Sequence, residues 1–206
     1  MRLSSLLATV VLGVSVGLSP VGAGPASAGK DLPPLMLGPG DAGVSDIGGK
    51  AVMRMTKHGY VYISGQHSHH LRITYVKDRN ILRYRDTRTP ALKSKPKTCG
   101  TENVKKGISV ICTVPKKFDD QKMFVQVWPR LGNDYTDARS LGRRFRLWVL
   151  ADDGVDVVHG GKGNDFVNGA MGNDRAYGGG GRDWLRGGPG ADTLVGGDGD
   201  DRVSQG

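Results

Sequence analysis

The 206-residue sequence contains a single glutamate, Glu102, although Asp and Glu together number 20. A thermolysin-type zinc site needs the pattern H-E-x-x-H. The residue immediately before Glu102 is Thr101, so this pattern is absent. An EF-hand loop also needs a glutamate at its end, and none follows the acidic stretch Asp198–Asp201. The one G-x-S-x-G match, Gly13–Gly17, lies in the apolar N-terminal segment, where a hydrolase elbow is not expected. We therefore expect no enzymatic activity.

Aromatic residues are also scarce, with 4 Phe, 3 Trp and 6 Tyr, whereas glycine is abundant at 33 residues. This composition argues against one large conventional core and favours turn-rich β structure. The sequence contains short runs of β-type residues and no amphipathic helical pattern of comparable length. The expected fold class is therefore all-β.

The N-terminus has the pattern of a secretory signal. Arg2 precedes an uncharged apolar run, Leu3–Leu18, and Ala26-Ser27-Ala28 is a small-x-small cleavage pattern. We expect a signal peptide at residues 1–28 and a secreted, extracellular protein. A retained membrane anchor is the alternative, although the apolar run is a little short to span a bilayer.

Only two cysteines occur, Cys99 and Cys112. In an exported protein such a pair predicts one disulfide, which would stabilise a loop of this size by roughly 3 kcal/mol. A zinc site is the alternative, but no paired histidines lie near the two cysteines.

Charge is divided unevenly along the chain. Residues 29–150 carry a net charge of +13, and residues 151–206 carry −5. The acidic part predicts cation binding, and the basic part suits an anionic partner such as a cell-surface polymer. No nucleic-acid-binding motif is present, so specific nucleic-acid recognition is not expected.

Local patterns divide the chain further. Residues 29–50 are rich in Gly and Pro and are expected to form a flexible linker. Residues 51–150 are expected to form a basic β-rich domain, with residues 87–106 as a long exposed loop. Its strands are predicted from short runs rich in β-branched and aromatic residues at 60–63, 71–76, 81–84, 108–112, 124–128 and 145–150.

From Ala151 to Ser204 the chain consists of six consecutive nonamers, such as GGKGNDFVN at 160–168. Position 4 is always glycine, position 6 is always aspartate and position 8 is always apolar. The aspartates are Asp156, Asp165, Asp174, Asp183, Asp192 and Asp201. A fixed short period of this kind indicates a solenoid.

Each position has a physical role. Glycines permit a tight turn with backbone carbonyls directed to one point, and positions 7–9 form a short strand with position 8 facing inward. If two nonamers make one turn, loops 18 residues apart stack at about 4.8 Å. Their aspartates then form one row at each edge, where calcium, which prefers oxygen ligands, fits between successive loops.

This segment resembles the RTX, or hemolysin-type, calcium-binding nonapeptide repeat, G-G-x-G-x-D-x-U-x. The resemblance implies a parallel β-roll over residues 151–206, with calcium as cofactor and the six aspartates as ligands. It also implies loop ligands to the metal at Gly161, Gly163, Gly172, Gly179, Gly181, Gly188 and Gly190. Up to four complete sites are expected, with affinities of about 10⁻⁴–10⁻³ M. The roll should be largely unfolded without calcium and fold on binding it.

Several residues depart from the repeat. Ala151 and Asp152 replace the first two glycines, Ala170 replaces another, and Arg182 lies beside Asp183, so sites using these loops should be weaker. Upstream, Gly132–Tyr135 looks like one degenerate loop, in which Asp134 is a candidate for a further site.

Other interpretations stay open at this point. The repeats could be a flexible acidic linker, although a linker needs no apolar residue at every eighth position. His67, His69 and His70 could bind a transition metal, or simply form a polar turn. An uncapped last turn of the roll would favour self-association.

Overall fold

The computed structural model describes residues 47–206, in which every regular element is a β-strand or a short 3₁₀ helix. The predicted signal peptide, residues 1–28, and most of the predicted linker, residues 29–50, lie outside the described residues. Within residues 47–206, no helix is long and apolar enough to cross a membrane.

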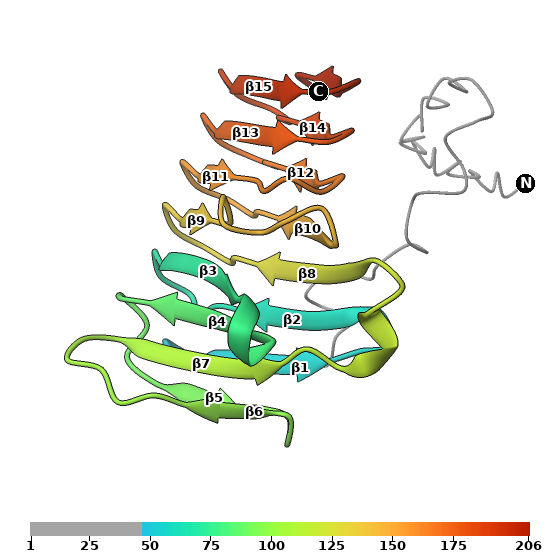
Figure 1. The fold of residues 1–206 in the computed structure, drawn as a ribbon. Helices are drawn as coiled ribbons and strands as arrows, with labels where there is room; N and C mark the ends of the chain where they lie inside the picture. Colours follow the sequence, from blue (N-terminus) through green and yellow to red (C-terminus); the bar gives the residue numbers. More distant parts are fainter. Residues whose placement is uncertain (1–46) are drawn as a thin grey trace, which may run out of the picture. The chain divides into compact units, whose positions relative to one another are not determined.

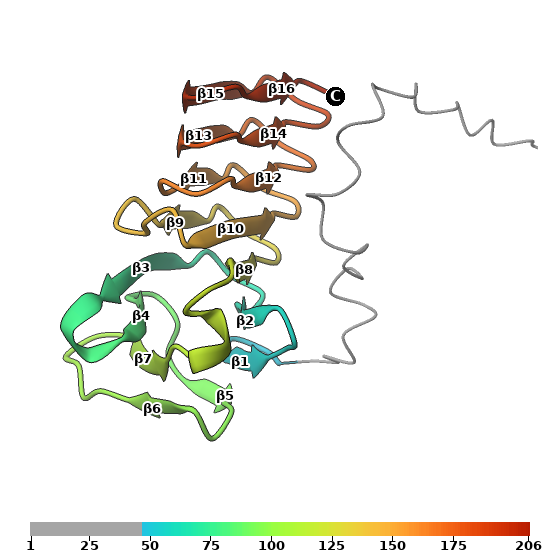
Figure 2. The same cartoon turned by 45° about the vertical axis from the view of Figure 1, so that its right-hand side comes forward.

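Sixteen strands form two eight-stranded sheets that face each other (Figures 1 and 2). Sheet A is built, in spatial order, from β16 (Arg202–Ser204), β14 (Trp184–Arg186), β12 (Phe166–Asn168), β10 (Phe145–Leu150), β8 (Met123–Trp128), β2 (Gly59–Ile63), β1 (Ala51–Met55) and β5 (Leu92–Ser94). Sheet B is built from β15 (Thr193–Asp198), β13 (Arg175–Gly180), β11 (Val157–His159), β9 (Tyr135–Asp137), β3 (His70–Val76), β4 (Ile81–Asp86), β7 (Ile108–Thr113) and β6 (Cys99–Thr101). Two 3₁₀ helices, η2 (Lys77–Arg79) and η3 (Lys116–Phe118), connect strands.

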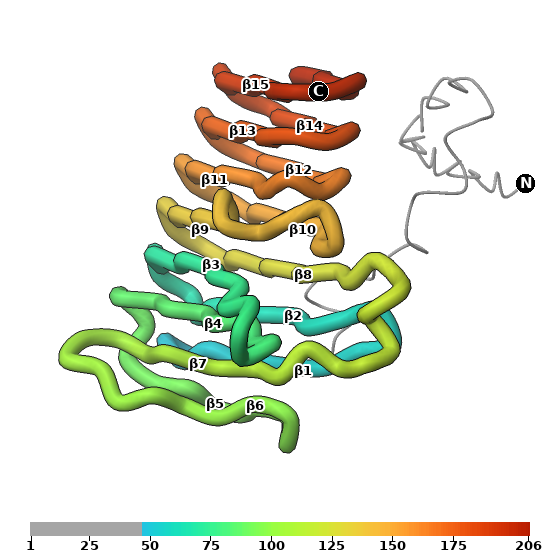
Figure 3. The backbone as a smooth tube through the Cα atoms, viewed as in Figure 1, coloured from blue at the N-terminus to red at the C-terminus, as the bar shows by residue number. Residues whose placement is uncertain are grey.

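The nonamers form a parallel β-roll, as the sequence predicts. Each repeat contributes one strand, and strands alternate between the two sheets, so the chain coils as the tube in Figure 3 shows. Val157 pairs with Arg175, and Phe166 pairs with Trp184, so each strand lies beside the strand 18 residues further on. Two nonamers therefore make one turn.

The roll continues upstream of the repeats. In sheet A, β12 pairs in parallel with β10, β10 with β8, and β8 with β2. In sheet B, β11 pairs in parallel with β9, and β9 with β3. The remaining strands of sheet B, β3, β4, β7 and β6, pair antiparallel. Both sheets thus pass without interruption from the basic segment into the repeats.

All six strands predicted in residues 51–150 are present, and the structure adds four. These are β1, β5, β6 and β9. The prediction of a long loop over residues 87–106 was wrong in part, because β5 and β6 lie within it. Both strands are only three residues long, and each is stabilised by pairing with another strand, β5 with β1 and β6 with β7.

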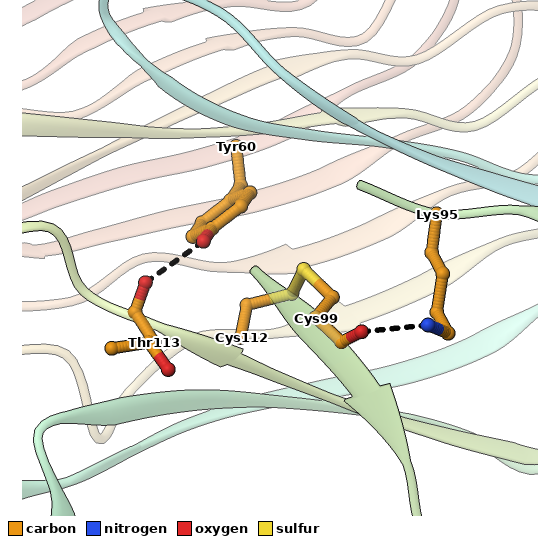
Figure 4. Close-up of a disulfide and its surroundings, with 5 residues drawn as sticks. All are labelled: Tyr60, Lys95, Cys99, Cys112 and Thr113. Atoms are coloured by element: carbon orange, nitrogen blue, oxygen red, sulfur yellow. Dashed lines mark hydrogen bonds between the residues drawn. A yellow bond between two sulfur atoms is a disulfide. The ribbon is translucent and has the colours of Figure 1, made fainter. Parts of the chain in front are cut away.

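A disulfide joins Cys99 and Cys112, which face each other across β6 and β7 (Figure 4). Nearby, the Tyr60 hydroxyl donates to the Thr113 carbonyl at 2.8 Å, and Lys95 Nζ donates to the Cys99 carbonyl at 2.7 Å. The disulfide therefore fixes the short β6 against the longer β7 at the end of the stack opposite the last repeat (Figure 1).

One continuous core fills the space between the sheets. Its members run from Ala51 in β1 to Leu185 in β14. The inward position-8 residues Val158, Val167 and Ala176 are buried, as the alternation predicts. Leu194 is half-buried and Val203 is 48% exposed, because β15 and β16 are the last strands of the stack.

The outer faces of the roll carry rows of aromatic rings that the repeat pattern does not predict. On sheet A, the Trp148 and Phe166 ring centroids are 4.4 Å apart, and the Phe166 and Trp184 centroids are 5.2 Å apart. On sheet B, the His159 and Tyr177 rings stack at 4.7 Å. Such pairs add to sheet stability because cross-strand neighbours lie within contact distance on one face.

Candidate calcium-binding edges

The aspartates at position 6 form two hydrogen-bonded ladders, one along each edge of the roll. On the first edge, the Asp156 N–H donates to Asp174 Oδ1 at 2.9 Å, and the Asp174 N–H donates to Asp192 Oδ1 at 2.9 Å. On the second edge, the Asp165 N–H donates to Asp183 Oδ1 at 2.7 Å, and the Asp183 N–H donates to Asp201 Oδ1 at 2.8 Å. The two rows have the membership that the period of 18 residues predicts.

Each carboxylate uses only one oxygen in its ladder. For Asp156, Asp174, Asp183 and Asp192, the second oxygen, Oδ2, is buried and has no hydrogen-bond partner. Asp165 differs, because its Oδ2 accepts the Gly161 N–H at 2.7 Å. A buried anionic oxygen without a partner is costly, so these atoms fit a bound cation.

Burial also changes how the carboxyl groups titrate. Loss of hydration, followed by the charges of neighbouring carboxylates, raises the pKa of Asp156 to about 8. Burial likewise raises the pKa of Asp165 to about 8 and that of Asp183 to about 6, and it raises the pKa of Asp174. Without a cation, the ladders therefore resist full ionisation near neutral pH.

The position-4 glycines stack directly on one another. A Cβ at Gly172 would meet the Gly154 carbonyl, and a Cβ at Gly190 would meet the Gly172 carbonyl. On the second edge, Gly181 lies in the same way over Gly163. Gly172, Gly181 and Gly190 also have φ values of +140°, +122° and +154°, which L side chains rarely adopt. Position 4 therefore requires glycine for two reasons: a Cβ would collide with the stacked carbonyl, and the backbone adopts a positive φ.

The position-2 residues are close-packed in the same manner. A Cβ at Gly179 would meet the Gly161 carbonyl, and a Cβ at Gly188 would meet the Ala170 carbonyl. The predicted loop residues thus divide between the edges. Gly172 and Gly188 with Gly190 lie on the first edge, and Gly161, Gly163, Gly179 and Gly181 lie on the second.

Position-1 glycines make room for the carboxylates. A Cβ at Gly169 would collide with Oδ2 of Asp174, and a Cβ at Gly178 would collide with Oδ2 of Asp183. The unpartnered oxygen of each aspartate therefore lies over the first residue of its own repeat, close to the loop backbone. This places a negative oxygen beside stacked main-chain carbonyls, which is the kind of donor set that calcium prefers.

The first-edge ladder extends beyond the repeats. The Asp134 N–H donates to Asp156 Oδ1 at 2.8 Å, and the His69 N–H donates to Asp134 Oδ1 at 2.7 Å. Asp134 is 3% exposed, and its Oδ2 also has no hydrogen-bond partner. Asp134 therefore occupies the register of a ladder aspartate, as the degenerate loop at 132–135 suggests.

His69 ends this ladder, a role that no pattern in the sequence indicates. Its ring is fully buried, with Nδ1 at 2.9 Å from Asp134 Oδ1 and Nε2 at 3.3 Å from Thr136 Oγ1. His70 instead packs its ring against Tyr135. Among residues 47–206, no three His, Cys, Asp or Glu side chains converge on one metal position, so His67, His69 and His70 do not meet in such a group.

The departures from the repeat have different structural effects. Ala170 has φ of +73° at position 2, where four of the six repeats have glycine, so its backbone is strained. The Arg182 N–H donates to Asn164 Oδ1 at 3.1 Å, and the Ala191 N–H donates to Asn173 Oδ1 at 2.8 Å, so Arg182 keeps the loop-to-loop bond at position 5. Arg182 therefore leaves the loop geometry intact.

Comparison with known families agrees with this geometry. Residues 150–185 and 177–204 match the family model described as the RTX calcium-binding nonapeptide repeat (4 copies). No curated protein and no solved structure matches the chain. The segment is thus an array of RTX repeats folded as a β-roll, and calcium is the cation that such repeats bind.

The described residues fit calcium. Each loop supplies one position-6 carboxylate, and because no group of three or more His, Cys, Asp or Glu side chains converges within residues 47–206, backbone oxygens of the stacked loops would complete a calcium site. Bound calcium would supply the positive charge that the unpartnered Oδ2 atoms lack. The chain's own contribution is to hold these oxygens in place through the N–H donors of the loop 18 residues upstream.

Proposed function

We propose that this protein is an exported calcium-binding protein whose roll completes its folding when it meets calcium outside the cell. The observation that carries the proposal is the double ladder of buried aspartates with unpartnered Oδ2 atoms. In the calcium-poor cytosol these carboxylates would oppose folding, and in a calcium-rich exterior they would be bridged. The six ladder aspartates, Asp156, Asp165, Asp174, Asp183, Asp192 and Asp201, are the proposed side-chain ligands.

Export is supported by three features of the chain. The N-terminal segment has the pattern of a signal peptide, and the Cys99–Cys112 disulfide suits an oxidising compartment. RTX repeats, moreover, are typical of exported proteins. Expression of the full chain with fractionation of cells and medium tests this part. A protein retained in the cytoplasm with its full N-terminus would contradict export.

Calcium-dependent folding is tested by far-UV circular dichroism in a chelator and during a calcium titration. We expect a cooperative gain of β signal with a midpoint of about 10⁻⁴–10⁻³ M. Asp174→Ala and Asp183→Ala remove one ladder member on each edge, and both should weaken the transition. An unchanged spectrum throughout the titration would contradict the proposed function.

No catalytic function is proposed, because the roll is a structural calcium-binding element and the chain offers no recognised catalytic motif. A second candidate is adhesion to an anionic cell-surface polymer through the basic segment, with the roll as a calcium-stabilised scaffold. It is favoured by the exposed lysines Lys93, Lys95, Lys97, Lys105 and Lys106, which lie in and around β5 and β6 at the end of the stack opposite the last repeat (Figure 1). Binding that is insensitive to salt would contradict this candidate.

A further inference from the structure

A pocket of about 730 Å³ opens on the second edge of the roll. One wall consists of the backbone of three stacked loops, and the other carries basic side chains from Lys122, just before β8, and from the β9–β10 connection. The pocket is lined by Lys122, Arg139, Arg143, Gly160, Gly161, Lys162, Asn164, Gly179, Gly180, Gly181, Asp198 and Gly199. Its size lies in the range of small-molecule sites.

The lining has four cationic side chains and one carboxylate, Asp198, and the charge of Arg139 is balanced by its ion pair with Asp137. Two of the cations are held in place. Lys122 Nζ donates to the Arg143 carbonyl at 2.6 Å, and Arg139 binds both oxygens of Asp137 at 2.9 Å. Arg139 also lowers the pKa of Asp137 to about 2, so this pair is fully ionised. Arg143 and Lys162 are exposed at the rim and can reach a ligand.

The loop wall brings a second property. The Cβ positions of Gly179 and Gly181 face the Gly161 and Gly163 carbonyls of the stacked loop, so this wall adds only the Lys162 and Asp198 charges to the pocket. Gly161, Gly179 and Gly181 belong to the same loops that carry Asp165 and Asp183, the second-edge calcium ligands proposed above. Calcium on this edge would neutralise the nearest carboxylates and fix the loops, so the pocket would become more positive and more rigid at the same time.

We propose that this pocket binds an oxyanion group (sulfate, phosphate or carboxylate) of an anionic cell-surface polymer, and that binding requires the calcium-loaded roll. This inference rests on the proposed calcium-dependent folding. It differs from adhesion by the lysines around β5 and β6, because the binding groups lie on the calcium edge and their wall exists only when the repeats are folded. Calcium would then control both folding and attachment.

The test is fluorescence anisotropy of labelled dextran sulfate with the purified protein, in millimolar calcium and in chelator. The double variant Arg143→Gln/Lys162→Gln removes two charges from the pocket rim. The matched control Lys77→Gln/Arg79→Gln likewise removes one lysine and one arginine charge, from the exposed helix η2. We expect the rim variant to bind about tenfold more weakly in calcium and the control to change by less than about twofold. Chelation should weaken binding of the wild type at least as much as the rim variant does.

Equal losses in the two double variants would overturn the inference, because diffuse basic charge would then explain binding. Wild-type affinity in the rim variant, or equal affinity in calcium and chelator, would overturn it as well. Circular dichroism of the same samples separates the two proposals. A roll that folds with calcium but binds polymer independently of calcium contradicts only the pocket. Competition by poly(glycerol phosphate) and by polyglutamate then tells which oxyanion the pocket accepts best.

Discussion

Replacement of Asp183 by asparagine should have opposite effects with and without calcium. In the structure, Asp183 Oδ1 accepts the Asp165 N–H at 2.7 Å, and Oδ2 is buried without a partner. Asparagine keeps an oxygen for the first interaction but removes the buried charge. The expected gain in chelator follows from the pKa of Asp183, which is raised to about 6 by burial. A shift of about two units is worth at most ~3 kcal/mol at pH 8, and solvent screening reduces the expected gain to about 1–2 kcal/mol.

With calcium the sign reverses. Asp183 lies between Asp165 and Asp201 on its ladder, so in the proposed arrangement its charge would serve two neighbouring calcium sites. Its loss should raise the calcium midpoint at least about tenfold. The first assay is the β signal of circular dichroism at pH 8 in chelator, which should be larger for Asp183→Asn than for the wild type. The second is a calcium titration followed by the same signal. Asp200→Asn is the matched control, because Asp200 is exposed and lies outside the ladder. If Asp183→Asn lowers stability equally in both conditions, or leaves the calcium midpoint unchanged, the reasoning is refuted.

Three further predictions concern the same roll. In chelator, stability should be greatest below about pH 4 and fall as pH rises towards 8. The reason is that the folded pKa values of Asp156 and Asp165, about 8, lie above the unfolded value of 3.8. Thermal melts measure this dependence, and a rise in stability over this pH range would contradict it. Ala170→Gly should stabilise the calcium-bound roll by about 1 kcal/mol in urea unfolding, because Ala170 has φ of +73°; a loss of stability would show that its strain is unimportant. Replacing Cys99 and Cys112 by serine should lower the free energy of unfolding by roughly 3 kcal/mol. A reductant should lower the stability of the wild type but not that of this variant.

Most of the roll could be predicted from the sequence, because every property it needs recurs within nine residues. Glycine at position 4 fixes the turn, the apolar position 8 fixes the inward face, and the aspartate at position 6 fixes the edge. The period of two repeats per turn then sets which aspartates are neighbours, as Asp156 with Asp174 and Asp165 with Asp183 show. These constraints are local, and the same residue types occur at the same positions in each repeat.

The segment before the repeats could be predicted only in part. Its strands are visible as β-branched and aromatic runs, but their pairing depends on residues far apart in the chain. β2 lies beside β8, where Tyr60 pairs with Val125, and β3 lies beside β9, where His70 pairs with Tyr135. The two residues of each pair are 65 positions apart in the sequence. Short strands such as β5 and β6 have too little local pattern to be recognised without their partners.

The sequence by itself therefore determined the repeat, the two aspartate rows and calcium as the cation that such repeats bind, because periodicity carries that information along the chain. Only the tertiary structure decided that the sheets continue upstream, that His69 ends the first-edge ladder at Asp134, and that basic side chains face the second calcium edge. These features arise from contacts between segments that do not repeat, and no local pattern encodes their register.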